Sequence, residues 1–291
     1  MRKTTLVKVA VTLIGVLLTG SIIWVWHRRR QHLRPTEKSL TFEFGDTNAT
    51  KAFLKRNQKS LPKFERLMDL GNKCLGRLVR PENRTEDICF GLGHTCREDF
   101  SEILFLCANG YSNAGLKLLR GLYERAVALA YIVKVPEKVD RFTNFAAIQE
   151  YRAMKAALEL VSEADFDKAM GADYSAAEIR KRYQAIKPDF PKAMSWDQSV
   201  GAMAKELGVP YSQLYLVCYA IPNFSIHATL ASAARWEGCG NSESEADFVV
   251  LNAAWIFALV LDSQNKLFGS NLAADIAALW QDLMQKPDTS A

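Results

Sequence analysis

The chain has 291 residues, of which 49% are hydrophobic and 24% are charged, a composition typical of a folded globular protein. Its formal charge of +5 is unevenly placed: residues 1–36 hold seven of the 37 basic residues and none of the 32 acidic ones. The rest of the chain therefore carries 30 basic against 32 acidic residues, which argues against the basic face that nucleic-acid-binding domains present. Nucleic acid is not the expected partner.

An apolar segment near the N-terminus predicts a membrane anchor. Residues 9–26, VAVTLIGVLLTGSIIWVW, carry no charge over a length sufficient to cross a hydrocarbon core of about 30 Å. A cleavable signal peptide is the alternative, but its apolar core ends in small residues, whereas this one ends in Trp24 and Trp26. We therefore expect residues 1–36 to form a retained transmembrane helix with a basic flank.

The charges around this span also predict its orientation. Arginines follow it at positions 28, 29, 30 and 34, against Arg2 and Lys3 before it. Because positive residues stay on the cytoplasmic side, we expect a single-pass protein of the inner (plasma) membrane with a cytoplasmic C-terminal domain. The basic segment 37–80 fits an anionic membrane surface, and it fits a solvated helix face equally well.

Beyond the anchor, the pattern predicts a polar linker over residues 37–58 and an all-α, multi-helix bundle over residues 59–291. No region shows the sustained alternation of a β-strand. Capping-box patterns at Thr95–Glu98 and Ser175–Glu178 mark two of the expected helix starts. The helices are expected near residues 61–79, 95–108, 113–134, 136–160, 178–186, 196–207, 211–234, 244–268 and 272–286.

The segment LKLLRGLYERAVALAYI, residues 116–132, is apolar nearly all the way round, yet it carries Arg120 and Glu124 one turn apart. At 100° per residue, Arg120 falls inside an apolar stripe and Glu124 falls at its edge. We therefore expect both side chains to be buried and paired, because an unpaired interior charge is costly. The pair is either a structural ion pair or one wall of a functional pocket.

A second polar group follows in YSQLYLVCYAIPNFSIHATLASAARW, residues 211–236. Its tyrosines recur every four residues on one helix face, and Pro222 must interrupt the helical hydrogen bonds after them. We expect this kink to turn His227 toward the Arg120–Glu124 pair, although a lone histidine can equally be a core residue. The candidate catalytic residues are thus Arg120, Glu124 and His227, and the candidate ligand-binding residues are Tyr123, Tyr215, Tyr219, Asn223 and Ser225.

These stretches resemble a family of helical bacterial proteins catalogued as domain of unknown function 5677. The resemblance rests on LLRGLYERAVALAYI, on VPEKVDRFTNFAAIQEYR, and on the later Y-x3-Y-x3-Y and S-I-H-A patterns, and it spans about residues 95–236. It implies a helical fold and marks Arg120, Glu124, Tyr215 and His227 as the family's characteristic polar positions. It implies no known reaction.

A weaker resemblance points to helical HEPN ribonucleases, which carry an arginine, often followed by asparagine, shortly before a histidine. The equivalent here is P-N-F-S-I-H, with Asn223 and His227 in place and Pro222 where the arginine should stand. Arg120 is the cation that would have to replace it from another helix. A hydrolase or nuclease using Arg120, Glu124 and His227 is therefore the alternative to a non-catalytic module that binds a protein or a small anionic ligand.

The cysteines and the one cluster of metal-ligand types predict neither disulfides nor a metal. Cys89, His94 and Cys96 have poor spacing for zinc and no evident fourth ligand, so no metal and no cofactor are expected. The cysteines form no CxxC pair, and we expect reduced thiols in a domain that faces the cytosol. They are Cys74, Cys89, Cys96, Cys107, Cys218 and Cys239.

Overall fold

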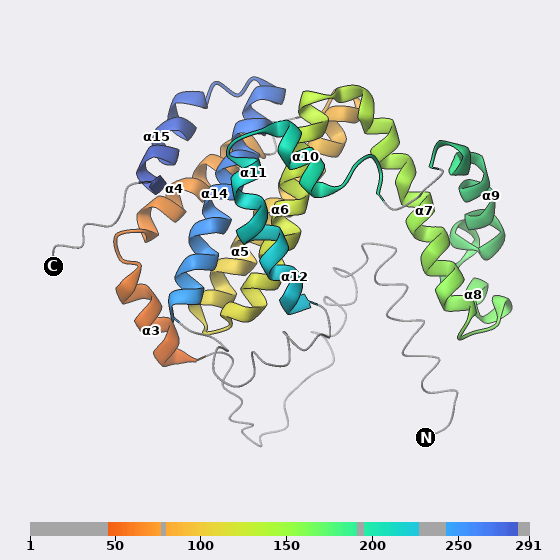
Figure 1. Cartoon of the computed structure of the whole chain (residues 1–291), viewed down its shortest axis with the longest axis horizontal. Helices are drawn as coiled ribbons and strands as arrows, with labels where there is room; N and C mark the ends of the chain where they lie inside the picture. Colours follow the sequence, from red (N-terminus) through yellow and green to blue (C-terminus); the bar gives the residue numbers. More distant parts are fainter. Residues whose placement is uncertain (1–45, 77–79, 191–194, 227–242, 285–291) are drawn as a thin grey trace, which may run out of the picture. The chain divides into compact units, whose positions relative to one another are not determined.

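The computed structural model describes residues 46–76, 80–190, 195–226 and 243–284, and within these ranges all regular secondary structure is helical (Figure 1). The all-α prediction is therefore confirmed for the described residues. The predicted transmembrane segment, residues 9–26, lies outside them. The helices form two compact units, one built from Asp140–Asp197 and the other from the flanking parts of the chain.

Three long helices form the centre of the larger unit. α5 (Arg84–Ala108), α6 (Ser112–Lys134) and α14 (Glu243–Phe268) pack against one another (Figure 1). α4 (Leu61–Cys74) and α15 (Ala273–Met284) pack against α14 and against each other. α6 and α14 bury apolar residues on more than one face, whereas the buried residues of α5 form a single stripe.

Among the described residues, α14 is long and apolar enough to cross a membrane, and 67% of its most apolar window is buried inside the protein. Such burial is typical of a core helix. Two of its polar side chains form hydrogen bonds inside the protein: Ser263 Oγ donates to the Leu259 carbonyl at 3.0 Å, and Gln264 Nε2 donates to the Cys89 carbonyl at 2.5 Å. Gly93 on α5 allows this approach, because a Cβ there would clash with the Gln264 amide.

Shorter helices also pack against α6. α10 (Val200–Leu207) is followed by α11 (Tyr211–Tyr215), by η4 (Leu216–Ala220), which is one π-helical turn, and by α12 (Ile221–Ile226). The wide turn directly precedes Pro222, whose ring would collide with the carbonyl four residues earlier in a regular α-helix. The predicted interruption at this proline is therefore confirmed, as a π turn.

The smaller unit contains most of α7 (Val139–Leu158), then α8 (Glu163–Met170) and α9 (Ala176–Ile186). Short 3-10 turns accompany these helices at η1 (Pro136–Lys138), η2 (Ala172–Tyr174) and η3 (Lys187–Asp189). The N-cap of the capping box predicted at α9 is confirmed, since Ser175 Oγ accepts the Glu178 N–H at 3.4 Å. The unit has its own apolar core, formed by Met154, Ala157, Phe166, Ala176 and Ile179.

Two local predictions are wrong. The expected linker over residues 37–58 contains a helix, α3 (Thr47–Arg56), which Asp46 caps and which buries Phe53. Thr95 does not start a helix but lies inside α5, where its hydroxyl donates to the Gly91 carbonyl at 3.1 Å. α5 begins earlier because Asn83 accepts the Glu86 N–H at 3.0 Å, a better cap placed before the same apolar run.

Candidate functional site

Arg120 and Glu124 meet where α6 packs against η4. Nη2 of Arg120 donates to the Tyr219 hydroxyl at 3.3 Å, and the guanidinium carbon lies 4.8 Å from the centre of the Tyr219 ring. Nη1 lies 3.6 Å from Oε2 of Glu124, close enough for an ion pair and too long for a hydrogen bond. The predicted contact between the two residues is present, with Tyr219 as its third member.

The predicted burial of this pair is wrong. The side chain of Arg120 is 27% exposed and that of Glu124 is 46% exposed, whereas Leu116, Leu119 and Tyr123 on the same helix are almost completely buried. The helical wheel correctly places the apolar stripe of α6. It cannot show how far η4 and α12 cover that stripe. Arg120 packs against the Tyr219 ring and keeps part of its head in solvent, as long cationic side chains do at the edge of an apolar surface.

The described residues use little of the hydrogen-bonding capacity of Arg120. A guanidinium has five N–H donors, and the described residues supply one acceptor at hydrogen-bond distance. Its Nε is buried without a hydrogen-bond partner in the described part of the chain, and so are Oδ1 of Asn113 on α6 and Oδ1 of Asn223 on α12. These unpartnered atoms belong to α6 and α12, two helices that pack together.

Of the predicted tyrosines, Tyr219 contacts Arg120, and Tyr123 and Tyr215 pack around Tyr219. Tyr123 is fully buried and its hydroxyl donates to the Tyr211 carbonyl at 2.7 Å, so it links α6 to α11 in the core. Burial raises the pKa of Tyr123 above its ordinary value. Tyr215 stacks on Tyr219 with ring centres 5.4 Å apart and packs against Gly201, where a Cβ would lie 3.1 Å from its ring. Tyr219 is the tyrosine that reaches Arg120.

The remaining predicted residues lie at or just beyond the end of the described stretch 195–226. Asn223 is partly buried on α12, one turn beyond Tyr219. Ser225 belongs to α12, and its side chain lies outside the described structure. His227 also lies outside the described residues, so its approach to Arg120 stays a prediction.

A neighbouring arginine, Arg125, pairs with a buried carboxylate, and the sequence analysis missed this ion pair. Arg125 donates through Nε to Oδ2 of Asp99 at 2.7 Å, and its Nη2 contacts the same oxygen. Asp99 is 7% exposed; burial raises its pKa, and the attraction of Arg125 opposes that rise. Gly121 makes room for the guanidinium, since a Cβ there would lie 2.8 Å from Arg125 Nη2. RGLYER thus holds two partly exposed arginines, of which Arg125 pairs with a buried carboxylate and Arg120 with an exposed one.

Asp99 carried a signal that sequence reasoning could have used. It lies among the buried residues Cys96, Phe100 and Ile103 of α5, on the face directed to the core. A carboxylate in such a stripe requires a cation from another helix. The pattern within α6 alone could not show which of its arginines supplies that cation.

The side chains that could bind a metal, and the cysteine thiols, form no second candidate site in the described part of the protein. No group of three or more His, Cys, Asp or Glu side chains there is arranged to hold a metal ion. Five cysteines lie in the described ranges, and all of them are buried free thiols. Burial raises the pKa of Cys89 and of Cys218 to about 12, which suppresses the reactive thiolate.

Comparison with known proteins assigns this sequence to a family. A family of unknown function (DUF5677) has a model that matches residues 86–243, more than half of the chain. The chain belongs to this family. No curated protein and no solved structure matches the chain. The DUF5677 region begins in α5 and includes α6, η4 and α12, so both arginines and the tyrosine face lie inside it.

Proposed function

We propose that this DUF5677 protein is a membrane-tethered helical module that binds a small anionic ligand through Arg120. The observation that carries the proposal is the state of this guanidinium: it is held by Tyr219, it is partly open to solvent, and most of its donors are unused by the described residues. A planar guanidinium with free N–H groups matches the oxygens of a carboxylate or a phosphate.

The surroundings favour a fixed rather than a mobile arginine. The Tyr219 ring lies under the guanidinium and is itself stacked on Tyr215, which packs against Gly201 of α10. Holding the cation in place before the ligand arrives lowers the entropy cost of binding. Glu124 attracts the same guanidinium across 3.6 Å, so a bound anion competes with a loose ion pair rather than with a hydrogen-bonded one.

Tethering is the second part of the proposal and rests on sequence. The uncharged segment 9–26, the tryptophans at its end and the arginines that follow support a retained single-pass helix with the helical units on the cytoplasmic side. Protease added to intact spheroplasts should leave residues 37–291 uncut. Cleavage of these residues from outside, or a mature N-terminus near residue 27, would show that the anchor or its orientation is wrong.

Binding is tested with the full chain in mild detergent and inorganic pyrophosphate as the probe. A ligand present at 100 times its dissociation constant stabilises a folded protein by about 2.7 kcal/mol, so the melting temperature should rise on titration. Arg120→Ala should abolish the rise. Arg180→Ala is the matched control, because Arg180 is an exposed arginine on α9 that pairs with Glu163. An equal rise in all three proteins would mean that pyrophosphate binds elsewhere.

A ribonuclease is the second candidate, favoured by the position of Arg120. From α6 it places a cation against Tyr219, one turn before Asn223 of α12, which carries the first five residues of P-N-F-S-I-H. If RNA is the substrate, the full chain should cleave single-stranded RNA, and Arg120→Ala and His227→Ala should each remove the cleavage. Binding of pyrophosphate without cleavage of RNA would leave the binding module as the function.

A further inference from the structure

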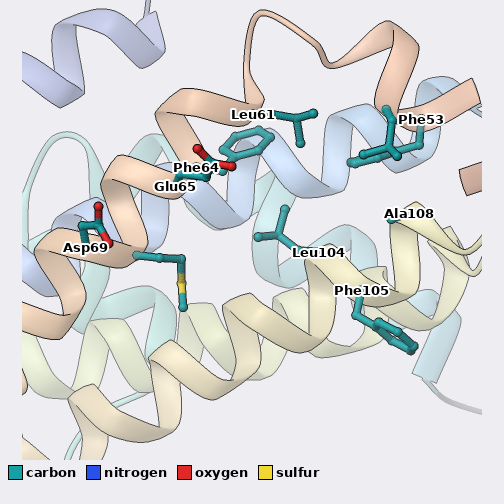
Figure 2. Close-up of a pocket in the computed structure, with 10 residues that line it drawn as sticks. Phe53, Leu61, Phe64, Glu65, Asp69, Leu104, Phe105 and Ala108 are labelled. Carbon is teal, nitrogen blue, oxygen red and sulfur yellow. The ribbon is translucent and has the colours of Figure 1, made fainter. Parts of the chain in front are cut away.

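An apolar groove lies on the larger unit between α3, α4 and α5 (Figure 2). It has a volume of about 440 Å³, and Phe53, Phe64 and Leu104 are among the apolar side chains that line it. Leu54, which also lines it, is 46% exposed, and Phe105 is 67% exposed and borders a second hollow on α5. Exposure of apolar side chains this large is unfavourable, so the groove has the composition of a surface that another segment covers.

The charged residues that line the groove and the adjoining hollow are all acidic. Glu65 and Asp69 line the groove itself, and Glu102 lines the hollow beside it. All three are exposed, and none of them forms an ion pair with the described residues. These charges disfavour an anionic lipid surface as the partner and favour a segment that combines apolar with basic side chains.

The chain that leads into α3 joins the described structure at one end of this groove. The N–H of Asp46, the N-cap residue of α3, donates to the carbonyl of Asn109 at 3.4 Å. Asn109 directly follows Ala108, which lines the groove. Figure 2 shows Ala108 and Asp69 at opposite ends of the groove. A segment that precedes Asp46 can therefore enter the groove at its Ala108 end.

The sequence before α3 has the composition that the groove favours. Residues 38–45 read KSLTFEFG, in which apolar residues alternate at positions 40, 42 and 44. In an extended chain these three side chains lie on one face, and those of Thr41 and Glu43 lie on the other. Between residues 27 and 45, five basic residues stand against two acidic ones. The segment thus offers an apolar face and a net positive charge to an apolar, acidic groove.

The length of the segment fits as well. From Leu61 to Asp69, α4 advances about 12 Å along the groove at 1.5 Å per residue. Eight extended residues span up to about 26 Å at 3.3 Å per residue, which is enough to follow the groove to its far end. We propose that residues 38–45 of the same chain occupy the groove in extended form, with their apolar face against Leu54 and Phe105 and with Lys38 toward the acidic end.

This docking is independent of the membrane tether. Residues 38–45 stay in the chain even if the predicted anchor is cleaved near residue 27, so a failure of the tethering proposal leaves the docking proposal intact. Where the anchor is retained, the docked segment holds the larger unit next to it.

Photo-cross-linking of the full chain in the producing cells tests the occupant. Benzoylphenylalanine in place of Phe105 substitutes a photoreactive aromatic side chain for the exposed ring, and peptide mass spectrometry after irradiation identifies its neighbour. The expected product is an intramolecular cross-link to residues 38–45. The same label in place of Leu160, which is 64% exposed on the smaller unit, is the control and should not give this product.

Two double variants test the face of the segment that is used. Phe42→Ser/Phe44→Ser should lower the yield of the cross-link roughly fivefold or more, because it removes the apolar contacts. Thr41→Ser/Glu43→Gln, on the opposite face, should leave the yield unchanged. Circular dichroism melts must show that both variants remain folded. A cross-link from position 105 to a second copy, to lipid or to another protein, with none to residues 38–45, overturns the proposal. Equal losses of yield in both variants overturn it as well.

Discussion

The two arginines of RGLYER should respond differently to removal. In Arg125→Ala, Asp99 keeps its buried position and loses its cation, a situation that costs about 3–5 kcal/mol. In Arg120→Ala, the losses are a loose and partly exposed ion pair, one hydrogen bond to Tyr219 and its cation–π contact, together about 1–2 kcal/mol. The arginine that the sequence suggests is buried is therefore the less costly to remove.

Thermal unfolding of the full chain in detergent, followed by tryptophan fluorescence, measures the difference. In a folded unit of this size, 1 kcal/mol shifts the melting temperature by about 2–4 °C. Arg125→Ala should therefore lower it by about 6–20 °C, and Arg120→Ala by about 2–8 °C. The double variant Asp99→Ala/Arg125→Ala should be more stable than Arg125→Ala alone, because it no longer contains a buried unpaired carboxylate.

Two outcomes would refute this account of the arginines. If Arg120→Ala were as damaging as Arg125→Ala, Arg120 would be a structural residue and a poor candidate for ligand binding. If the Asp99→Ala/Arg125→Ala variant were less stable than Arg125→Ala, the cost would come from lost packing of the Arg125 stem rather than from the orphaned charge.

Three further predictions concern the core. Gly93→Ala should destabilise the protein by about 1–3 kcal/mol because its Cβ meets a buried amide, whereas Gly91→Ala, with nothing within 4 Å, should be neutral or stabilising; equal effects would contradict the packing described. Tyr123→Phe should cost about 0.5–1.5 kcal/mol by removing the buried hydrogen bond to the Tyr211 carbonyl, and no loss would mean that this bond contributes little to stability. Iodoacetamide at pH 8 should leave Cys218 unmodified in the folded chain and alkylate it in denaturant, because burial raises its pKa to about 12; rapid native labelling would show that the thiol is accessible.

The helical content and much of the site could be predicted because they depend on local patterns. Proline and serine positions marked the starts of η1, which leads into α7, and of α9. The four-residue spacing of Tyr215 and Tyr219 put both on one helix face, and their rings contact Tyr123 of α6. The contact between Arg120 and Glu124 follows from their one-turn separation. Each of these inferences needs only the geometry of a single helix.

What the sequence could not show depends on contacts between distant segments. The partner of Arg125 lies on another helix, 26 residues earlier, so the sequence of RGLYER could not show that this arginine pairs with a buried carboxylate. The partial exposure of Arg120 depends on how much of α6 the neighbouring η4 and α12 cover. α3 was missed because its sequence is mostly polar. The burial of Phe53, which stabilises this helix, comes from tertiary packing.

The measurement that tests the central claim most directly is a calorimetric titration of inorganic pyrophosphate into the full chain, comparing wild type with Arg120→Ala, Arg120→Lys and Arg180→Ala. Saturable binding should appear in wild type and in Arg180→Ala, weaken in Arg120→Lys because the lysine lacks the planar fork of donors, and disappear in Arg120→Ala. Binding of unchanged affinity in Arg120→Ala, or no binding of any protein in the series, would contradict the assignment of Arg120 as the anion-binding residue.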